Sequence, residues 1–146
     1  MEDRFENFTL TILKLNKLVS KIKLYEMRGY GLKAIHVMCI HCLAGSKGLT
    51  AGELAKQTLE DKAAISRALA TLKEKGFVEY DAGAYGAEIK LTDGGAKVAE
   101  YIGAAADRAV NAAGGNLTEG ERAEFYGSLA KITADLEKYY EELCAE

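Results

Sequence analysis

The chain has 146 residues, enough for one domain with a buried core, and its 49% hydrophobic and 28% charged residues are ordinary for a globular protein. The net charge of −3 excludes a generally basic nucleic-acid coat, and no apolar run reaches the ~18–20 residues that a bilayer-spanning helix needs. Because Met1-Glu2-Asp3-Arg4 begins no signal peptide and three cysteines make no disulfide framework, we expect reduced thiols and a cytoplasmic protein.

A helix with a narrow apolar seam is predicted at the start of the chain. Its apolar residues alternate steps of three and four, and they are Phe5, Phe8, Ile12, Leu15, Val19 and Ile22. The segment Arg28-Gly29-Tyr30-Gly31 breaks this helix. Residues 32–44 are then apolar on nearly all sides, which predicts a helix at the centre of the fold.

The stretch from Gly48 to Thr92 has the order of a winged helix-turn-helix. Thr50 and Glu53 form a capping box that begins one helix, and Asp61 is placed to cap a second helix. The second helix carries one apolar face, formed by Ile65, Leu69 and Leu72. Gly76 ends it, and the runs 77–80 and 88–91 then flank a Gly-containing loop, the pattern of a β-hairpin. In such a unit the second helix can enter a DNA major groove.

Two further helices are predicted after the hairpin. Thr92-Asp93 opens one of them, whose inward side would be small: Val98, Ile102, Ala105 and Ala109. Thr118 and Glu121 form a capping box that begins the other, whose apolar seam is Phe125, Leu129, Ile132, Leu136, Tyr139 or Tyr140, and Leu143. Because one chain has little core left to cover the first and last seams, we expect a homodimer in which the terminal helices of two subunits interleave. A helical hairpin within one chain is the alternative.

The central residues resemble the MarR family of winged helix-turn-helix regulators. Residues 61–69 and 72–78 look like its recognition helix and exit, residues 49–55 like the preceding helix, and residues 89–95 like the second wing strand and the entry to the next helix. The fold class that follows is mainly α with a small β-hairpin wing and with dimerisation helices from both termini. Residues 1–146 would form a single MarR-like unit, with a DNA-binding lobe at 32–92 and a helical dimerisation region at 1–31 and 93–146.

The wing departs from the family pattern. The family commonly has an arginine after the strand that follows the recognition helix and an Asp-x-Arg in the wing, whereas this chain has Tyr80 and the loop Asp81–Ala87 without Lys or Arg. A wing arginine normally reaches the minor groove, where narrow A·T-rich DNA attracts cations. Tyr85 is the residue left there to supply a hydroxyl or stacking contact, the alternative being that it packs on its own hairpin.

The DNA-contacting residues are predicted from the recognition helix and its surroundings. Arg67 could pair with guanine or phosphate, Ser66 could donate to either, and Ala63 and Ala64 are small enough for a thymine methyl to approach. Four residues are expected to contact phosphates, namely Lys47, Thr50, Lys56 and Lys90. Lys62 and Tyr85 complete the predicted set. The alternative is a solvated helix face with routine charges.

Other kinds of site have weaker support. Effectors in this family often occupy a crevice between the DNA-binding lobe and the dimer helices, and its predicted lining is Tyr25, Tyr30, His36 and Cys39, which are equally suited to packing. No metal or cofactor is expected, because one helix cannot converge His36, Cys39, His41 and Cys42 on one ion. No enzyme is expected either, since the chain has no Gly-rich phosphate loop and no nucleophile elbow.

The sequence therefore predicts a sequence-specific DNA-binding transcriptional regulator. The resemblance implies a dimeric repressor that binds a pseudo-palindromic operator in double-stranded DNA and is released by a small-molecule effector. One alternative is a winged-helix protein-interaction module with little DNA affinity. Another is a thiol-based redox-sensing repressor, although the sensing cysteine of such relatives typically lies near the start of the first long helix, where this chain has none.

Overall fold

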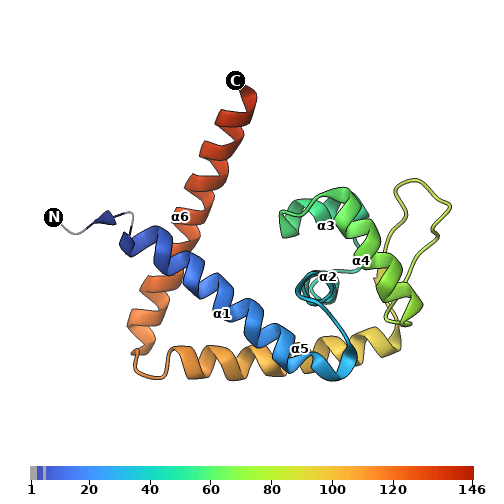
Figure 1. Cartoon of the computed structure of the whole chain (residues 1–146), viewed down its shortest axis with the longest axis horizontal. Coiled ribbons are helices and arrows are strands. Elements are labelled where there is room, and N and C mark those ends of the chain that lie inside the picture. Colours follow the sequence, from blue (N-terminus) through green and yellow to red (C-terminus); the bar gives the residue numbers. More distant parts are fainter. Residues whose placement is uncertain (1–2, 5) are drawn as a thin grey trace. The chain divides into compact units, whose positions relative to one another are not determined.

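The computed structural model describes residues 3–4 and 6–146 and consists mainly of helices (Figure 1). In chain order its elements are the π-helix η1 (Glu6–Leu10), α1 (Thr11–Glu26), the 3-10 helix η2 (Arg28–Tyr30), α2 (Ala34–Ala44), α3 (Ala51–Thr58), α4 (Lys62–Glu74), β1 (Val78–Glu79), β2 (Lys90–Leu91), α5 (Asp93–Ala113) and α6 (Glu119–Ala145). Phe5 of the predicted first seam and the leading Met1-Glu2 lie outside the described residues. None of the described helices is both long and apolar enough to cross a membrane.

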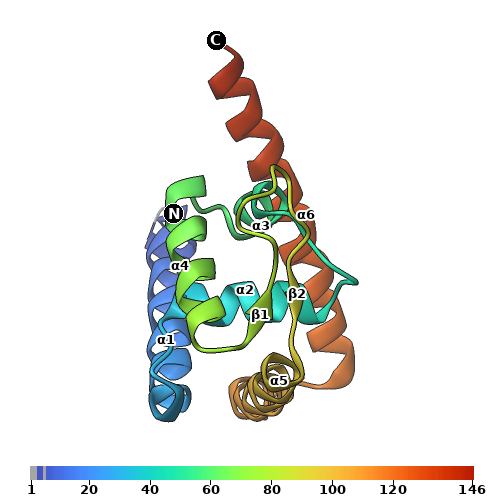
Figure 2. The same ribbon diagram turned by 90° about the vertical axis from the view of Figure 1, so that its right-hand side faces the viewer.

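The chain divides into two compact units, one ending at Ala106 and the other running from Asp107 to Glu146. In the first unit, α2 lies at the centre and contacts α1, α3, α4 and β2 (Figures 1 and 2). The prediction of a central apolar helix is confirmed, because α2 buries Val37, Cys39, Ile40 and Leu43. The core around it includes Leu54 from α3 and Ile65 and Leu72 from α4, all fully buried.

Local side-chain caps fix the ends of α3 and α4. Thr50 Oγ1 accepts a hydrogen bond from the Glu53 amide at 3.2 Å, and the Glu53 carboxylate accepts one from the Thr50 amide at 2.8 Å. Asp61 Oδ1 accepts from the Ala64 amide at 2.7 Å. The capping box and the Asp61 cap predicted from sequence are therefore confirmed, and they satisfy backbone donors that the first helical turn leaves unpaired.

The C-terminus of α4 ends in a tight reversal. Gly76 has a φ of +79°, a left-handed conformation that glycine adopts without a steric penalty. The Phe77 amide then donates to the Leu72 carbonyl at 2.9 Å, and the Gly76 amide donates to the Lys73 carbonyl at 3.0 Å. These two bonds are the Schellman pattern, so the chain leaves α4 in a fixed direction toward the hairpin.

The hairpin is shorter than the sequence suggests. β1 and β2 pair antiparallel, with Val78 opposite Leu91 and Glu79 opposite Lys90. Ile89 instead pairs with Leu49, whose amide donates to the Ile89 carbonyl at 3.1 Å and whose carbonyl accepts from the Ile89 amide at 2.7 Å. Through Ile89, the residue before β2, the wing is therefore bonded to the segment that precedes α3.

The long helices α1 and α6 expose their predicted seams. Phe8 on η1 and four residues on α1, Ile12, Leu15, Val19 and Ile22, are 38–44% exposed. In the second unit the Thr118–Glu121 capping box begins α6 as predicted, and Arg122 donates to the Gly114 carbonyl beyond the end of α5. On α6 the exposed apolar residues are Phe125, Tyr126, Ile132, Leu136, Tyr139, Tyr140 and Leu143. The seam residues stand on the helices as predicted, and the described residues leave most of them in contact with solvent.

Candidate nucleic-acid interface

The two sides of α4 differ sharply in exposure. Its inner side buries Ile65, Ala68, Leu69 and Leu72, each at most 2% exposed, as the spacing predicted. Its outer side is exposed and small or polar, and it consists of Lys62, Ala63, Ser66, Arg67 and Ala70. A helix anchored on one side by aliphatic residues presents its other side as a rigid surface, which is what major-groove readout requires.

The outer side of α4 is sterically suited to approach base edges. Ala63 and Ala70 extend no farther than Cβ, so the backbone can come close to a groove floor. The guanidinium of Arg67 has no hydrogen-bond partner among the described residues, while its backbone carbonyl accepts a hydrogen bond from Thr71 Oγ1 at 3.2 Å. Its five donors are therefore available for a guanine or a phosphate. Ala64 is half-buried and its amide is occupied by Asp61, so its contribution to contact is restricted to its methyl group.

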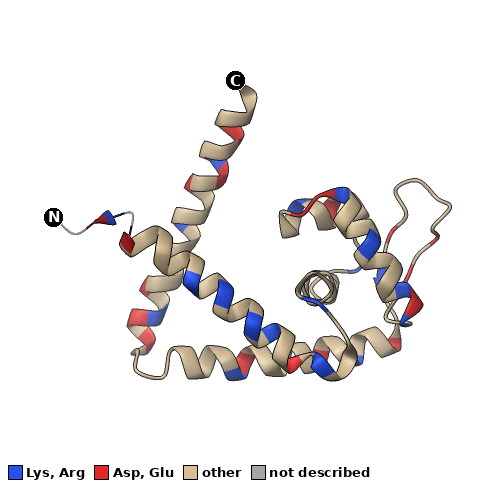
Figure 3. Ribbon diagram, viewed as in Figure 1, with Lys and Arg blue, Asp and Glu red and all other residues tan. Residues whose placement is uncertain are grey.

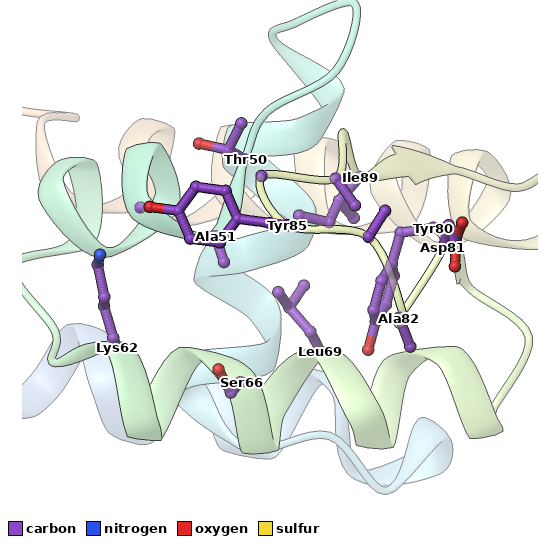
Figure 4. Close-up of a pocket in the computed structure, with 14 residues that line it drawn as sticks. Thr50, Ala51, Lys62, Ser66, Leu69, Tyr80, Asp81, Ala82, Tyr85 and Ile89 are labelled. Atoms are coloured by element: carbon purple, nitrogen blue, oxygen red, sulfur yellow. The ribbon is translucent and has the colours of Figure 1, made fainter.

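A groove separates α4 from the wing (Figure 4). Its volume is about 470 Å³, and it brings together four of the predicted DNA-contacting residues: Thr50, Lys62, Ser66 and Tyr85. In Figure 4, Lys62 extends from α4 toward α3, while Tyr85 reaches from the wing loop toward Thr50 and Ala51 at the start of α3. The side chain of Tyr85 is fully exposed, so the alternative that it packs on its own hairpin is wrong.

The other predicted contacts lie outside that groove. Lys47 and Lys56 are exposed before and within α3, and Arg67 points from α4 without lining the groove. Lys90 on β2 is exposed and forms an ion pair with Glu88 at 3.6 Å, so part of its field is offset by a neighbouring acid. The hydroxyl of Thr50 accepts the Glu53 amide, which leaves its proton free to donate to a phosphate.

Charge is unevenly distributed over the interface (Figure 3). Figure 3 shows blue Lys and Arg positions along α4. By sequence, the wing loop has Asp81 and Glu88 and no basic residue between 81 and 87. Asp81 Oδ1 accepts the Gly83 amide at 3.0 Å, so this acid also shapes the loop. Among the residues of the candidate interface, the positive charges are those of the helix-turn-helix and of Lys90 on β2, and the wing loop 81–87 adds none.

Sequence reasoning missed the contact between the end of α4 and the wing. Lys73 Nζ donates to the Tyr80 carbonyl at 2.8 Å and lies 4.5 Å from the centre of the Tyr80 ring. Tyr80 in turn lines the groove beside Leu69. The signal for this contact was Gly76, because a left-handed reversal there folds the residues on its two sides back toward each other. Lys73 therefore holds the base of the wing, in addition to complementing the helix dipole.

The residues predicted to line an effector crevice occupy different environments. Cys39 is fully buried, and burial raises the pKa of its thiol to about 12. His36 is buried, its Nδ1 accepts the Lys33 amide at 3.0 Å, and burial lowers its pKa. Tyr25 is exposed, with the Arg28 guanidinium 4.0 Å from its ring centre. Tyr30 meets two other aromatic rings, Phe77 and Tyr101.

Neither histidine nor cysteine forms a metal cluster in the described part of the chain. His41 is exposed and Cys42 is half-buried on α2, and no group of three or more His, Cys, Asp or Glu side chains there could hold an ion. Burial also raises the pKa of Cys42, although Lys23 lies close enough to oppose that shift. Cys144 is exposed near the end of α6.

Three features together define a winged helix-turn-helix fold. They are a helix with one buried side (α4), a capped helix before it (α3) and a two-stranded hairpin after it. Residues 30–84 match the model of the MarR family, whereas a comparison with curated protein sequences finds no match. The central part of the chain, residues 30–84, is therefore similar to the MarR family.

Solved structures agree with this fold over nearly the whole chain. A MarR protein from Peptoclostridium difficile is 19% identical with a TM-score of 0.87, covering 98% of this chain and 95% of its own. A MarR transcriptional regulator from Methanosarcina mazei is also 19% identical with a TM-score of 0.86, covering 94% of this chain and 93% of its own. S. aureus MepR in a DNA-binding conformation is 18% identical with a TM-score of 0.78, covering 88% and 98%.

Proposed function

We propose that this protein is a DNA-binding transcriptional regulator, a homodimeric repressor that binds a pseudo-palindromic operator through α4 and releases it when a small molecule binds. The observation that carries the proposal is the exposed outer side of α4, where Arg67 and Ser66 stand beside small residues on a helix anchored by fully buried aliphatic side chains. In a two-fold dimer this surface occurs twice, which matches an operator with two related half-sites.

Each α4 would read its half-site in the major groove. Arg67 would form a bidentate pair with a guanine, Ser66 would donate to a base or phosphate, and Ala63 would contact a thymine methyl. Residues on and around α4 would contact the DNA phosphate backbone. Lys62 and Thr50 line the protein groove between α4 and the wing, and Lys47, Lys56 and Lys90 lie outside it. Phosphate contacts carry no sequence information. Substituting one of these lysines should therefore weaken binding to all DNA sequences alike, whereas substituting a residue on the outer side of α4 should change which sequence is preferred.

The exposed seams support the dimer. Fully burying one large apolar side chain contributes about 1.5–3 kcal/mol, and each subunit offers several such side chains on α1 and α6. We therefore expect a dimer at micromolar concentration, which sedimentation velocity over a dilution series would show. Leu15→Glu and Leu136→Glu each place a charge in a seam and should raise the dimer dissociation constant, whereas a stable wild-type monomer would contradict the dimer.

DNA binding is tested by selection from a random duplex library with the purified full chain, followed by gel shift on the recovered sequence. We expect enrichment of an inverted repeat and a complex that contains two chains. The affinity should fall with salt, because each neutralised phosphate contributes about 0.9 to the slope of log affinity against log salt. If no sequence is enriched and only weak, sequence-independent retention occurs, the repressor proposal is wrong.

A specific observation favours one alternative, a winged-helix module that binds protein with little affinity for DNA. The wing loop has no basic residue, and Asp81 and Glu88 give it a negative field that would repel phosphates. The same selection experiment separates the two functions, because the module would enrich no operator. A thiol-based sensor is less favoured, since burial raises the pKa of both Cys39 and Cys42 and so opposes the reactive thiolate.

A further inference from the structure

One tyrosine connects the recognition helix to the long helices. Tyr30 lies in the η2 turn between α1 and α2, and its ring meets the edge of Phe77 at 6.4 Å and that of Tyr101 at 5.6 Å between ring centres. Its backbone carbonyl accepts a hydrogen bond from Lys75 Nζ at 3.3 Å. The Tyr101 hydroxyl donates to Glu26 Oε2 at 3.3 Å. We call these five residues the Tyr30 joint.

The joint holds the end of α4 from two sides. Lys75 and Phe77 flank Gly76, the residue at which the chain leaves α4 in a left-handed conformation. A polar contact to the Tyr30 backbone and a ring contact to the Tyr30 side chain therefore bracket the reversal. The Schellman bonds fix the local reversal at Gly76, and the contacts to Tyr30 hold that reversal against the turn between α1 and α2.

The same tyrosine contacts α5 directly and is linked to the end of α1 through Tyr101. Tyr101 belongs to α5 and Glu26 ends α1, and both helices fall in the region predicted to form the dimer. His36 of α2 accepts a hydrogen bond from the Lys33 amide at 3.0 Å, which fixes the start of α2 just after this turn. Tyr30 is thus the point where α1, α5 and the exit of α4 meet within the first unit.

We propose that the Tyr30 joint fixes the angle of α4 against α1 and α5 and thereby selects the spacing between operator half-sites. This inference rests on the proposed dimeric DNA binding. Two recognition helices must enter major grooves about one helical turn, roughly 34–36 Å, apart. Because the two lobes are held only through the dimer helices, a looser joint would let each α4 tilt and accept other spacings. Tyr30 is a positioning residue in this account and contacts no DNA.

The test compares duplexes that carry the selected operator with its half-sites at the original spacing, or with one base pair inserted or deleted at the centre. Dissociation constants are measured for the wild type, Tyr30→Leu, Tyr30→Phe and Tyr126→Leu. Tyr30→Leu removes both ring contacts, whereas Tyr30→Phe keeps them. Tyr126 is the control because it is an exposed tyrosine on α6 that lies outside the joint and outside the predicted seam.

We expect the wild type, Tyr30→Phe and Tyr126→Leu to prefer the original spacing by the same ratio. In Tyr30→Leu that ratio should shrink by more than the roughly 2- to 10-fold that one aromatic edge contact represents, because two such contacts are lost. Tyr101→Leu cuts the joint from the α5 side and should shrink the ratio as well, which keeps the test decisive if Tyr30→Leu folds poorly.

Two results would overturn the inference while leaving the proposed function standing. In one, Tyr30→Leu and Tyr101→Leu keep the wild-type preference for spacing. In the other, they weaken binding to all three duplexes by the same factor, which a merely destabilised lobe would do. A wild type that binds none of the duplexes would contradict the proposed function itself, and the spacing role would fall with it.

Discussion

Adding a positive charge to the bare wing should show whether the wing approaches DNA. Ala84 lies near the tip of the loop, is exposed, and lines the groove beside α4. Ala84→Arg would place one cation there in each subunit. If each cation neutralises one phosphate, the slope of log affinity against log salt steepens by about 1.8 for the dimer, at about 0.9 per phosphate. Doubling the salt concentration would then cost the variant about 3.5-fold more affinity than it costs the wild type.

The assay is fluorescence anisotropy on the selected operator over a range of salt concentrations. Ala84→Gln is the matched control, since it adds length and polarity without charge and should keep the wild-type slope. At low salt Ala84→Arg should bind more tightly than both. If its line coincides with that of the wild type, the wing does not approach the DNA backbone, and the docking of α4 and wing proposed here is wrong.

Three further predictions concern stability and reactivity. Gly95→Ala should cost more than the ~1–3 kcal/mol typical of overpacking, because its Cβ would overlap a backbone carbonyl oxygen next to β1, while Gly103→Ala on the same helix should be tolerated in a thermal melt. Leu59→Gly should stabilise by about 0.5–1 kcal/mol in denaturant titrations, since Leu59 has a φ of +56° and is 81% exposed. A thiol reagent at pH 8 should label Cys144 quickly and Cys39 only on unfolding, because burial raises the pKa of Cys39 to about 12; rapid labelling of Cys39 would revive the thiol-sensor alternative.

Local features of the fold could be predicted from the sequence because their causes are local. The capping box of Thr50 and Glu53 and the cap by Asp61 join residues three positions apart, so their spacing alone specifies them. The buried side of α4 follows from helical periodicity in the same way. The outer side of α4, and with it Ser66 and Arg67, could therefore be predicted as a surface, although its contact with DNA stays a prediction.

The rest depends on contacts between distant segments. Ile89 pairs with Leu49, 40 positions earlier, and no pattern within either segment predicts that pairing. The bond from Lys75 to the Tyr30 carbonyl joins residues 45 positions apart, and periodicity carries no information on such a pair. The left-handed conformation of Leu59 is also unexpected, because a bulky residue there is intrinsically unfavourable and is imposed by the helices on either side. The division into a DNA-binding lobe at 32–92 and a dimerisation region also stays a prediction.

The affinity of Arg67→Ala for the selected operator tests most directly the claim that the outer side of α4 reads DNA. Fluorescence anisotropy at fixed salt would compare it with the wild type and with Lys131→Ala, which removes an equal charge from the exposed surface of α6. A lost bidentate contact costs about 1–3 kcal/mol per half-site, so two half-sites predict a loss of at least about 30-fold. Arg67→Ala should show this loss with an unchanged unfolding midpoint, and Lys131→Ala should bind like the wild type. Equal affinity of all three proteins would contradict the claim and favour the protein-interaction module.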